Sequence, residues 1–291
     1  MYVSKPDQFL FIKSNKTAGT SIEIALSVCL ANRDNQFYTP LTFVDEITRI
    51  NLSGLSFSQE VKTILSCRKR NSFHKTLKKK LIRKRDKLSL LFGGNLSNLS
   101  SLRQTHDLNA ESFEVNTGYY NHISYERCLL MDPALAEYWS CTFARHPYKR
   151  FISFLGWRTR HILQDTYEWN IDDWKNFAGS MIDVFCKRNI YHFSVDRKKC
   201  KSVSKVLAYE KLKDSTNIMC EVLGLPAESI LNVMPNSKAG YSSIIKKISP
   251  DDILGKEIRS KLLKKEEFIF EGLGYKDSLE NFMPDRTSFS M

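Results

Sequence analysis

Short apolar runs alternate with longer amphipathic stretches along most of this 291-residue chain. A short continuous apolar run is typical of a buried strand, whereas apolar residues that recur every three or four positions are typical of a helix. On this basis the sequence predicts strands over residues 8–13, 139–144 and 203–209. It predicts helices over residues 20–31, 56–66, 72–91, 124–138 with a break at Asp132-Pro133, 147–161, 171–189, the segment from 210 to Gly224, and 251–271. Strands separated by helices favour an α/β fold with parallel strands.

The polar turn between the first predicted strand and helix has the composition of an anion site. Residues 14–21 read SNKTAGTS, with one lysine, one glycine and four hydroxyl side chains. A helix N-terminus presents N–H groups without intrahelical partners and the positive end of the helix dipole, which together favour a phosphate-like group. The turn lacks the GxxxxGK[ST] pattern of P-loop nucleotide-binding proteins, because it has one glycine and its lysine comes first. An ordinary helix capped by Thr20 or Ser21 is the alternative interpretation.

A second polar stretch follows the second predicted strand. Residues 142–154 read TFARHPYKRFISF, which places Arg145 at the strand end and Pro147 at the start of the next helix. An arginine can bind a phosphate through two N–H groups. Ser153 lies about two turns into that helix, and its hydroxyl reaches the same oxygens only if the helix packs back beside the strand end. The alternatives are that Arg150 pairs with an acid and that Ser153 is structural.

Together, these two stretches resemble the sulfotransferase family. KTAGTS after a first strand is similar to the family's 5′-phosphosulfate loop, PKT[GA]GTS, and the R-x-P-x-x-R-x-x-S spacing that starts at Arg145 is similar to its 3′-phosphate motif. VLAYEKL at 206–212, LGL at 223–225 and the later EEFIFEGLGY resemble the weaker C-terminal pattern of the carbohydrate-acting branch. One departure is Asn15, where the family usually has proline.

The resemblance implies an α/β, P-loop-like three-layer fold with a central parallel sheet flanked by helices. Residues 1–291 would form a single sulfotransferase domain with a basic, mainly helical insertion at about 50–105. The implied activity is transfer of a sulfuryl group from 3′-phosphoadenosine 5′-phosphosulfate (PAPS) to an acceptor hydroxyl on a carbohydrate. The implied chemistry needs no metal ion.

The resemblance also assigns roles to individual residues. Those that would cradle the 5′-phosphosulfate are Lys16, Thr17, Ala18, Gly19, Thr20 and Ser21. Arg145 and Ser153 would hold the 3′-phosphate, and Lys16 would also offset the charge that develops on the bridging oxygen. His122, in TGYYNHISYERC, resembles the base histidine of the heparan sulfate 2-O-sulfotransferase branch, so Lys16 and His122 are the expected catalytic residues. Glu23 is the alternative base, and a structural role for His122 is the alternative to catalysis.

Charge widens the list of partners beyond the donor nucleotide and a saccharide acceptor. The formal net charge of +12 and the pI near 9.3 favour polyanions. A dense basic block at 68–87 predicts contact with an anionic polymer or a membrane surface, and a solvated helix is the alternative. Two other interpretations of the whole chain compete with a sulfotransferase. One is a P-loop-type nucleotide-binding kinase, and the other is a non-catalytic basic module that binds nucleic acid or membranes.

Cysteine usage and hydropathy bear on the compartment. Seven cysteines without a CxxC pair favour free thiols in a reducing compartment, with a local Cys186–Cys200 disulfide as the alternative. The sequence has no charged-then-apolar leader and no apolar run of the ~18 residues that a membrane span needs. We therefore expect a soluble cytoplasmic protein. A Golgi lumenal location is the alternative if a membrane anchor has been removed.

Overall fold

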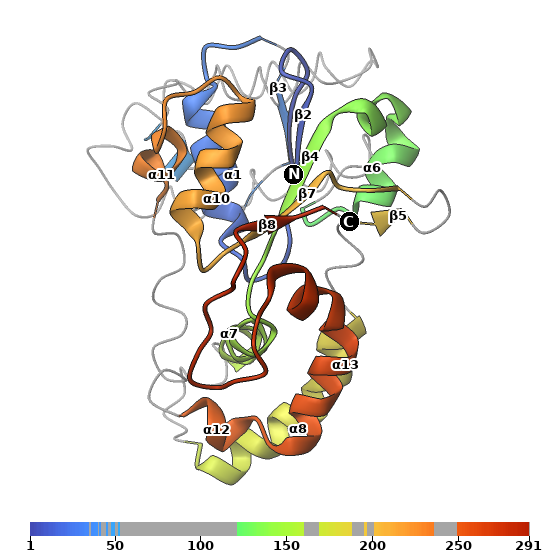
Figure 1. The fold of residues 1–291 in the computed structure, drawn as a ribbon, viewed down its shortest axis with the longest axis vertical. Helices are drawn as coiled ribbons and strands as arrows, with labels where there is room; N and C mark the ends of the chain where they lie inside the picture. The colour runs from blue at the N-terminus through green and yellow to red at the C-terminus, as the bar shows by residue number, and fades with distance from the viewer. Residues whose placement is uncertain are drawn as a thin grey trace, which may run out of the picture.

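The structure, a computed structural model, has an α/β fold built on a six-stranded mixed sheet (Figure 1). It describes residues 1–34, 36–39, 41, 45, 48–49, 52, 121–159, 169–187, 195–196, 201–235 and 249–290. The predicted helices at 56–66 and 72–91 lie outside the described residues, as does most of the predicted insertion. The basic block at 68–87 lies outside them as well.

The sheet has a parallel centre and antiparallel edges. Its strand order is β3 (Gln36–Tyr38), β1 (Tyr2–Ser4), β2 (Phe9–Ile12), β4 (Trp139–Ala144), β7 (Lys205–Ala208) and β8 (Ser288–Phe289). β2, β4 and β7 are parallel, whereas β1, β3 and β8 each run antiparallel to a neighbour. The expectation of a parallel sheet therefore holds for the centre alone. A tight turn, closed by the Gln8 N–H donating to the Lys5 carbonyl at 3.2 Å, joins β1 and β2 as a hairpin and forces the antiparallel pairing.

Helices cover both faces of this sheet. On one face, α1 (Gly19–Cys29) packs with α10 (Leu212–Val222) and α11 (Ser229–Val233). The other face carries α6 (Tyr125–Met131) and α7 (Pro147–Thr159), and beyond α7 lie α8 (Ile171–Lys187), α12 (Pro250–Ile253) and α13 (Lys256–Leu273) (Figure 1). A 3-10 helix follows α6 at Pro133–Glu137, and a separate two-stranded sheet pairs β5 (Val195–Asp196) with β6 (Lys201–Ser202).

Strand β2 shows why both faces must be covered. Its four residues are all fully buried and apolar. Phe9 and Phe11 belong to the core under α1 and α10, whereas Leu10 and Ile12 belong to the core shared with α6 and α7. Successive side chains of a strand point to opposite faces, so a continuous apolar run fits a strand enclosed on both sides.

Most predicted elements are present, with shifted ends. The strand at 139–144 is confirmed, and the helix predicted at 251–271 is divided between α12 and α13 by Leu254 and Gly255. Asp132 ends α6, and its side chain accepts a hydrogen bond from the Ala134 N–H at the start of the 3-10 helix. Cys186 carries a free thiol. Within the described ranges, no helix combines the length and the apolar character that crossing a membrane requires.

Candidate functional site

The candidate site lies at the carboxyl edge of the three parallel strands. Ile12 of β2 pairs with Thr142 of β4, and Ala144 of β4 pairs with Ala208 of β7. The segments that leave these strands therefore emerge side by side. They are the turn that leads into α1, the Arg145–His146 segment that leads into α7, and the segment that begins at Tyr209. Ligands of open α/β sheets bind at this edge.

Helix α1 begins at Gly19, and its N-cap is Ala18 in the left-handed region at φ 54°. The methyl side chain of Ala18 cannot accept a hydrogen bond from the first-turn N–H groups. Because the N-cap position is Ala18, the alternative in which Thr20 or Ser21 caps the helix is wrong. Both residues lie inside the first turn and are buried. Lys16 is also left-handed, at φ 65°. Two such non-glycine residues in one turn cost backbone energy, a feature that clusters at ligand-binding sites.

Gly19 is required by close packing rather than by its backbone angles. A Cβ at this position would lie 2.4 Å from Cγ of Lys13 and 3.3 Å from the Ser14 carbonyl oxygen. The Lys13 side chain therefore runs directly against the first residue of α1. The glycine of the KTAGTS stretch lets the helix start approach the end of β2 this closely.

Ser14 and Thr17 tie the turn to itself and to the sheet. Their hydroxyl oxygens lie 2.7 Å apart, Thr17 Oγ1 donates to the Ser14 carbonyl at 3.2 Å, and Ser14 Oγ donates to the carbonyl of Phe143 in β4. Both residues are buried. Thr17, an expected nucleotide ligand, thus shapes the turn through its side chain.

Lys16 lies against helix α7. Its Nζ is 4.8 Å from the centroid of the Trp157 ring. Ser153 is one helical turn before Trp157, so the two side chains share a face of α7 that is directed toward the turn after β2. Ser153 is half-buried, and its hydroxyl forms no hydrogen bond with any described residue. The structure thus brings Ser153 to the side of the site that holds Lys16.

Arg145 lies at the end of β4 over an aromatic ring. Its guanidinium carbon is 4.8 Å from the centroid of Tyr209, and its Nε is 3.9 Å from Oε1 of Glu210. Nε is buried and has no hydrogen-bond partner in the described part of the chain. No hydrogen bond or ion pair joins Arg145 to Ser153 there. A buried donor without a partner is costly, and an anion at this edge would satisfy it.

Glu210 and His146 lie next to Arg145 at this edge of the sheet. Glu210 accepts hydrogen bonds from the His146 N–H at 3.1 Å and from the Tyr275 hydroxyl. The His146 ring is fully buried against Phe270 and Phe282, among other aromatic rings, and burial lowers its pKa to about 4. A neutral, enclosed imidazole orients this turn and carries no charge for an anion. Glu210 belongs to the VLAYEKL stretch, but the sequence alone did not predict a role for it.

Arg150, the second arginine of the R-x-P-x-x-R-x-x-S pattern, points away from this edge. Its Nη2 donates to Oε1 of Glu266 in α13 at 2.7 Å, and both side chains are buried. Its guanidinium also lies over the Phe185 ring of α8, at 4.7 Å. The alternative in which Arg150 pairs with an acid is therefore the one that the structure contains.

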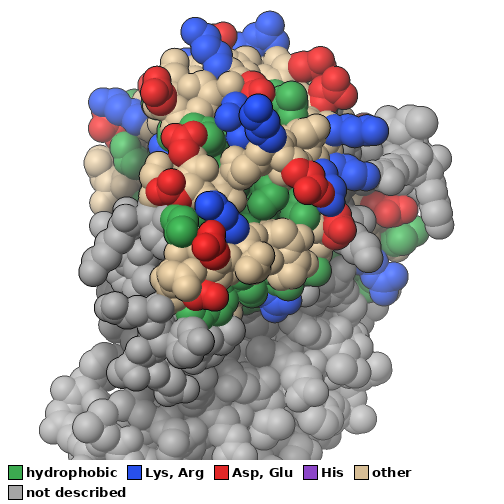
Figure 2. Space-filling model, turned by 90° about the horizontal axis from the view of Figure 1, so that it is seen from below, with side chains coloured by type: hydrophobic (Ala, Val, Ile, Leu, Met, Phe, Trp, Pro, Cys, Tyr) green, Lys and Arg blue, Asp and Glu red, His purple; other side chains and the backbone are tan. Residues whose placement is uncertain are grey.

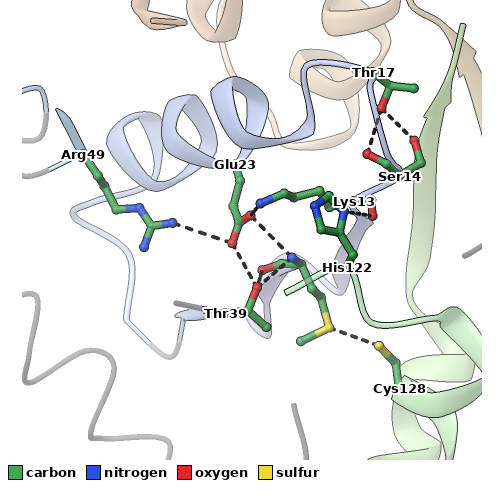
Figure 3. A network of polar contacts seen from close by, with 9 residues as sticks. Lys13, Ser14, Thr17, Glu23, Thr39, Arg49, His122 and Cys128 are labelled. Atoms are coloured by element: carbon green, nitrogen blue, oxygen red, sulfur yellow. Dashed lines mark hydrogen bonds and ion pairs between the residues drawn. The ribbon is translucent and has the colours of Figure 1, made fainter. Parts of the chain in front are cut away.

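His122 comes to the turn from a distant part of the sequence (Figure 3). Its Nδ1 is 3.3 Å from the carbonyl oxygen of Lys13, the residue that directly follows β2. His122 is half-buried and has a left-handed backbone, at φ 63°. The structure thus places the predicted base next to the start of the predicted donor loop, although His122 and Lys13 are 109 positions apart.

Glu23, the alternative base, is fully buried within a cluster of cations (Figure 3). Its carboxylate lies 3.2 Å from Lys13 Nζ, 3.5 Å from the Met1 ammonium and 3.6 Å from Arg49 Nη2, and it accepts from Thr39 Oγ1 at 3.3 Å. Burial by itself would raise the pKa of Glu23, but these cations lower it below its ordinary value. Glu23 is therefore an ionised carboxylate of the buried scaffold. The sequence analysis missed this cluster, and the one sequence signal that could have indicated it is a lysine directly after an apolar strand, Lys13.

The other four histidines of the chain apart from His146, namely His74, His106, His161 and His192, lie outside the described residues. Among the described residues on the face that Figure 2 shows, basic and acidic side chains are interleaved. Within the described ranges, no group of three or more His, Cys, Asp or Glu side chains is placed to hold a metal ion.

Comparisons of this chain with protein-family models, with curated proteins and with solved structures found no match. A functional assignment for this chain therefore depends on the geometry at the carboxyl edge of the sheet.

Proposed function

We propose that this protein is a sulfotransferase that moves a sulfuryl group from PAPS to a hydroxyl of a carbohydrate acceptor. One observation carries the proposal: two segments with the composition of anion sites, remote in sequence, leave adjacent parallel strands at the same edge of the sheet. One segment is the KTAGTS turn after β2, and the other contains Arg145 after β4. A nucleotide with phosphates on both its 5′ and its 3′ positions accounts for the two together. A P-loop-like fold and a single domain over residues 1–291 belong to the same proposal.

The turn after β2 fits the 5′-phosphosulfate. The first turn of α1 presents backbone N–H groups and the positive end of the helix dipole. Gly19 allows the start of α1 to pack closely against the end of β2. Lys16 adds a full positive charge to the same turn. Thr20 and Ser21 lie in the first turn, where their backbone N–H groups belong to the helix N-terminus. Thr17 and Ala18 contribute by fixing the left-handed path of the turn.

Arg145 and Ser153 fit the 3′-phosphate. The buried Nε of Arg145 has no hydrogen-bond partner among the described residues, and a phosphate oxygen would supply one. The Ser153 hydroxyl lies on the face of α7 that carries Trp157 and therefore looks toward the same edge. Arg150 is not available for this role because it is paired with Glu266.

PAPS supplies the sulfuryl group, and the chain supplies orientation and charge. Lys16 offsets the negative charge that develops on the bridging oxygen, and the α1 N-terminus holds the transferring group in line with the acceptor. His122 accepts the proton of the acceptor hydroxyl, which by itself is a weak nucleophile. The residues at this edge perform these roles without a metal ion.

Calorimetric titration of the full chain tests the proposal. We expect 3′-phosphoadenosine 5′-phosphate (PAP) to bind in the presence of a chelator with undiminished affinity. Adenosine 5′-phosphate, which lacks the 3′-phosphate, should bind much more weakly. Preferential binding of ATP with Mg²⁺ over PAP would contradict the proposal and favour a kinase. Transfer of label from PAPS to one member of a glycan panel would then establish the acceptor.

A further inference from the structure

The Lys13 side chain is buried, and its ammonium group and its alkyl chain contact different residues of α1. Its ammonium lies 3.2 Å from the Glu23 carboxylate, and its side chain is 1% exposed. Its alkyl chain packs against Gly19, where the Cβ of any other residue would meet it at 2.4 Å. Glu23 is one helical turn after Gly19, on the same face of α1. The first turn of α1, Lys13 and Glu23 are therefore one packed unit.

The carbonyl of Lys13 lies against the imidazole of His122. The distance between this oxygen and Nδ1 is 3.3 Å. A carbonyl oxygen can accept a hydrogen bond but cannot donate one, so the contact requires a proton on Nδ1. The left-handed φ of His122 and the full burial of Ile123 directly after it hold the ring at this place. A strained backbone at a candidate base is the kind of feature that accompanies function.

We propose that Lys13 is a positioning residue that fixes the tautomer of His122. Its carbonyl keeps the proton on Nδ1, so that Nε2 carries the lone pair, whereas a histidine side chain in water favours the opposite tautomer. The Lys13–Glu23 ion pair anchors the carbonyl because it fixes the chain at the end of β2. Glu23 therefore acts through Lys13 and is not itself the base.

The proposal rests on the proposed function and specifies which atom takes the proton. During transfer, the acceptor oxygen bonds to sulfur while the bond between sulfur and the bridging oxygen breaks. That electron pair stays on the bridging oxygen of the departing PAP. The hydroxyl proton of the acceptor passes to Nε2, and the resulting imidazolium is stabilised by its Nδ1–H bond to the Lys13 carbonyl. The serine-protease triad uses the same logic, in which the group behind the histidine sets its tautomer.

Nitrogen-15 NMR of the imidazole side chains tests the tautomer without any assay of activity. The full chain is labelled at histidine, and the His122 signals are assigned as those missing from a His122→Asn variant. Asparagine tolerates the left-handed backbone and can donate to the Lys13 carbonyl, so this variant should fold. At a pH where the ring is neutral, with and without PAP, we expect a protonated Nδ1 and an unprotonated Nε2. A protonated Nε2 would overturn the proposal.

A lysine variant tests the anchor. Lys13→Met keeps the backbone carbonyl and most of the side-chain volume but removes the ion pair. We expect His122 to lose its single tautomer, and kcat with radiolabelled PAPS and the best acceptor of the glycan panel to fall about 10-fold. The Kd of PAP should change less than about 2-fold, because Lys13 is buried against Glu23 and is not among the proposed nucleotide ligands. An unchanged tautomer and an unchanged kcat would refute the positioning role. If Lys13→Met does not fold, the NMR measurement of the His122 tautomer in the unaltered protein still tests the proposal.

The outcomes also separate this inference from the proposed function. A protonated Nδ1 in a protein that neither binds PAP nor transfers sulfate would support the tautomer assignment and defeat the sulfotransferase proposal. Robust sulfate transfer by a protein whose His122 is protonated on Nε2 would support the sulfotransferase proposal and defeat the tautomer assignment.

Discussion

The buried ion pair between Arg150 and Glu266 makes a quantitative prediction about the packing of α7 against α13. The two charged atoms are 2.7 Å apart, and the side chains of Arg150 and Glu266 are 4% and 0% exposed. Arg150→Met removes the charge and keeps much of the volume. The Glu266 carboxylate then stays in an apolar environment without its cation. Only the protein's own relaxation, or protonation of Glu266, can relieve the cost.

The magnitude follows from the distance. Coulomb's law with an effective dielectric constant of about 20 gives about 6 kcal/mol of attraction at 2.7 Å. Part of this attraction offsets the desolvation of the two ions, so the pair itself contributes little net stability. Removing one partner alone leaves the desolvation of the other uncompensated, which costs about 3–5 kcal/mol. We therefore expect Arg150→Met to lower the free energy of unfolding by about 3–5 kcal/mol at neutral pH.

The loss should depend on pH in a definite direction. Burial raises the pKa of Glu266 above its ordinary value, and the Arg150 guanidinium offsets part of that rise. Without Arg150, the folded-state pKa rises further above the unfolded value. An acid with a raised folded-state pKa favours the folded state while it is protonated, and this contribution is lost as pH rises through the folded pKa. The deficit of Arg150→Met should therefore be largest at and above neutral pH and should shrink as the pH falls toward the ordinary pKa of glutamate.

Urea denaturation of the full chain at several pH values measures both effects. The double variant Arg150→Met/Glu266→Leu replaces the pair by apolar residues and should regain wild-type stability or exceed it. Lys264→Met, an exposed lysine on the same helix as Glu266, is the matched control and should stay within about 0.5 kcal/mol of the parent. If Arg150→Met has wild-type stability but loses affinity for PAP, the reasoning is refuted, because Arg150 would then serve the phosphate.

Three further substitutions test the site itself, with Lys5→Ala, an exposed lysine in the β1–β2 turn, as the control for charge. Lys16→Ala should lower sulfate transfer about 10²- to 10³-fold while PAP still binds by calorimetry, and near-normal turnover would exclude the role of Lys16 at the bridging oxygen. Arg145→Ala should weaken PAP binding by about 1.5–3 kcal/mol, and an unchanged Kd would exclude Arg145 as a ligand of the 3′-phosphate. Gly19→Ala should lower the thermal stability by about 1–3 kcal/mol in calorimetric melting because its Cβ would meet Lys13, and an unaltered melting curve would show that the turn accommodates it.

The sequence predicted the parts of the fold that local patterns determine. The central strand β2 is a continuous apolar run, β4 and β7 are short and mostly apolar, and α1 and α7 follow polar turns that mark helix starts. β1, β3 and β8 were missed because they have three, three and two residues. A segment that short has no measurable periodicity. It becomes a strand only through pairing with a neighbour that is often distant in sequence, as when Ser288 pairs with Leu207.

The candidate site likewise combines features that local sequence predicts with contacts between distant residues that it does not predict. The KTAGTS turn and Arg145 were recognisable because each combines charge or hydroxyl groups with a strand end. The Arg150–Glu266 pair joins residues 116 apart, and the contact between Lys13 and His122 joins residues 109 apart. Local sequence does not determine which partner a charge will find across such separations. Only the arrangement of α7 and α13, and of β2 and the start of α6, decides these pairs.

The environments of four basic residues in the two motifs and next to them differ. Lys13 and Arg150 are buried and lie 3.2 Å and 2.7 Å from carboxylates, so their charges are neutralised within the fold. Lys16 and Arg145 each lie 4.8 Å from an aromatic centroid, and the Glu210 carboxylate is 3.9 Å from Arg145. An aromatic face holds a cation in place without cancelling its charge. Under the proposed function, Lys16 and Arg145 are therefore the cations that we expect to contact the doubly phosphorylated nucleotide, whereas Lys13 and Arg150 belong to the buried scaffold of the site.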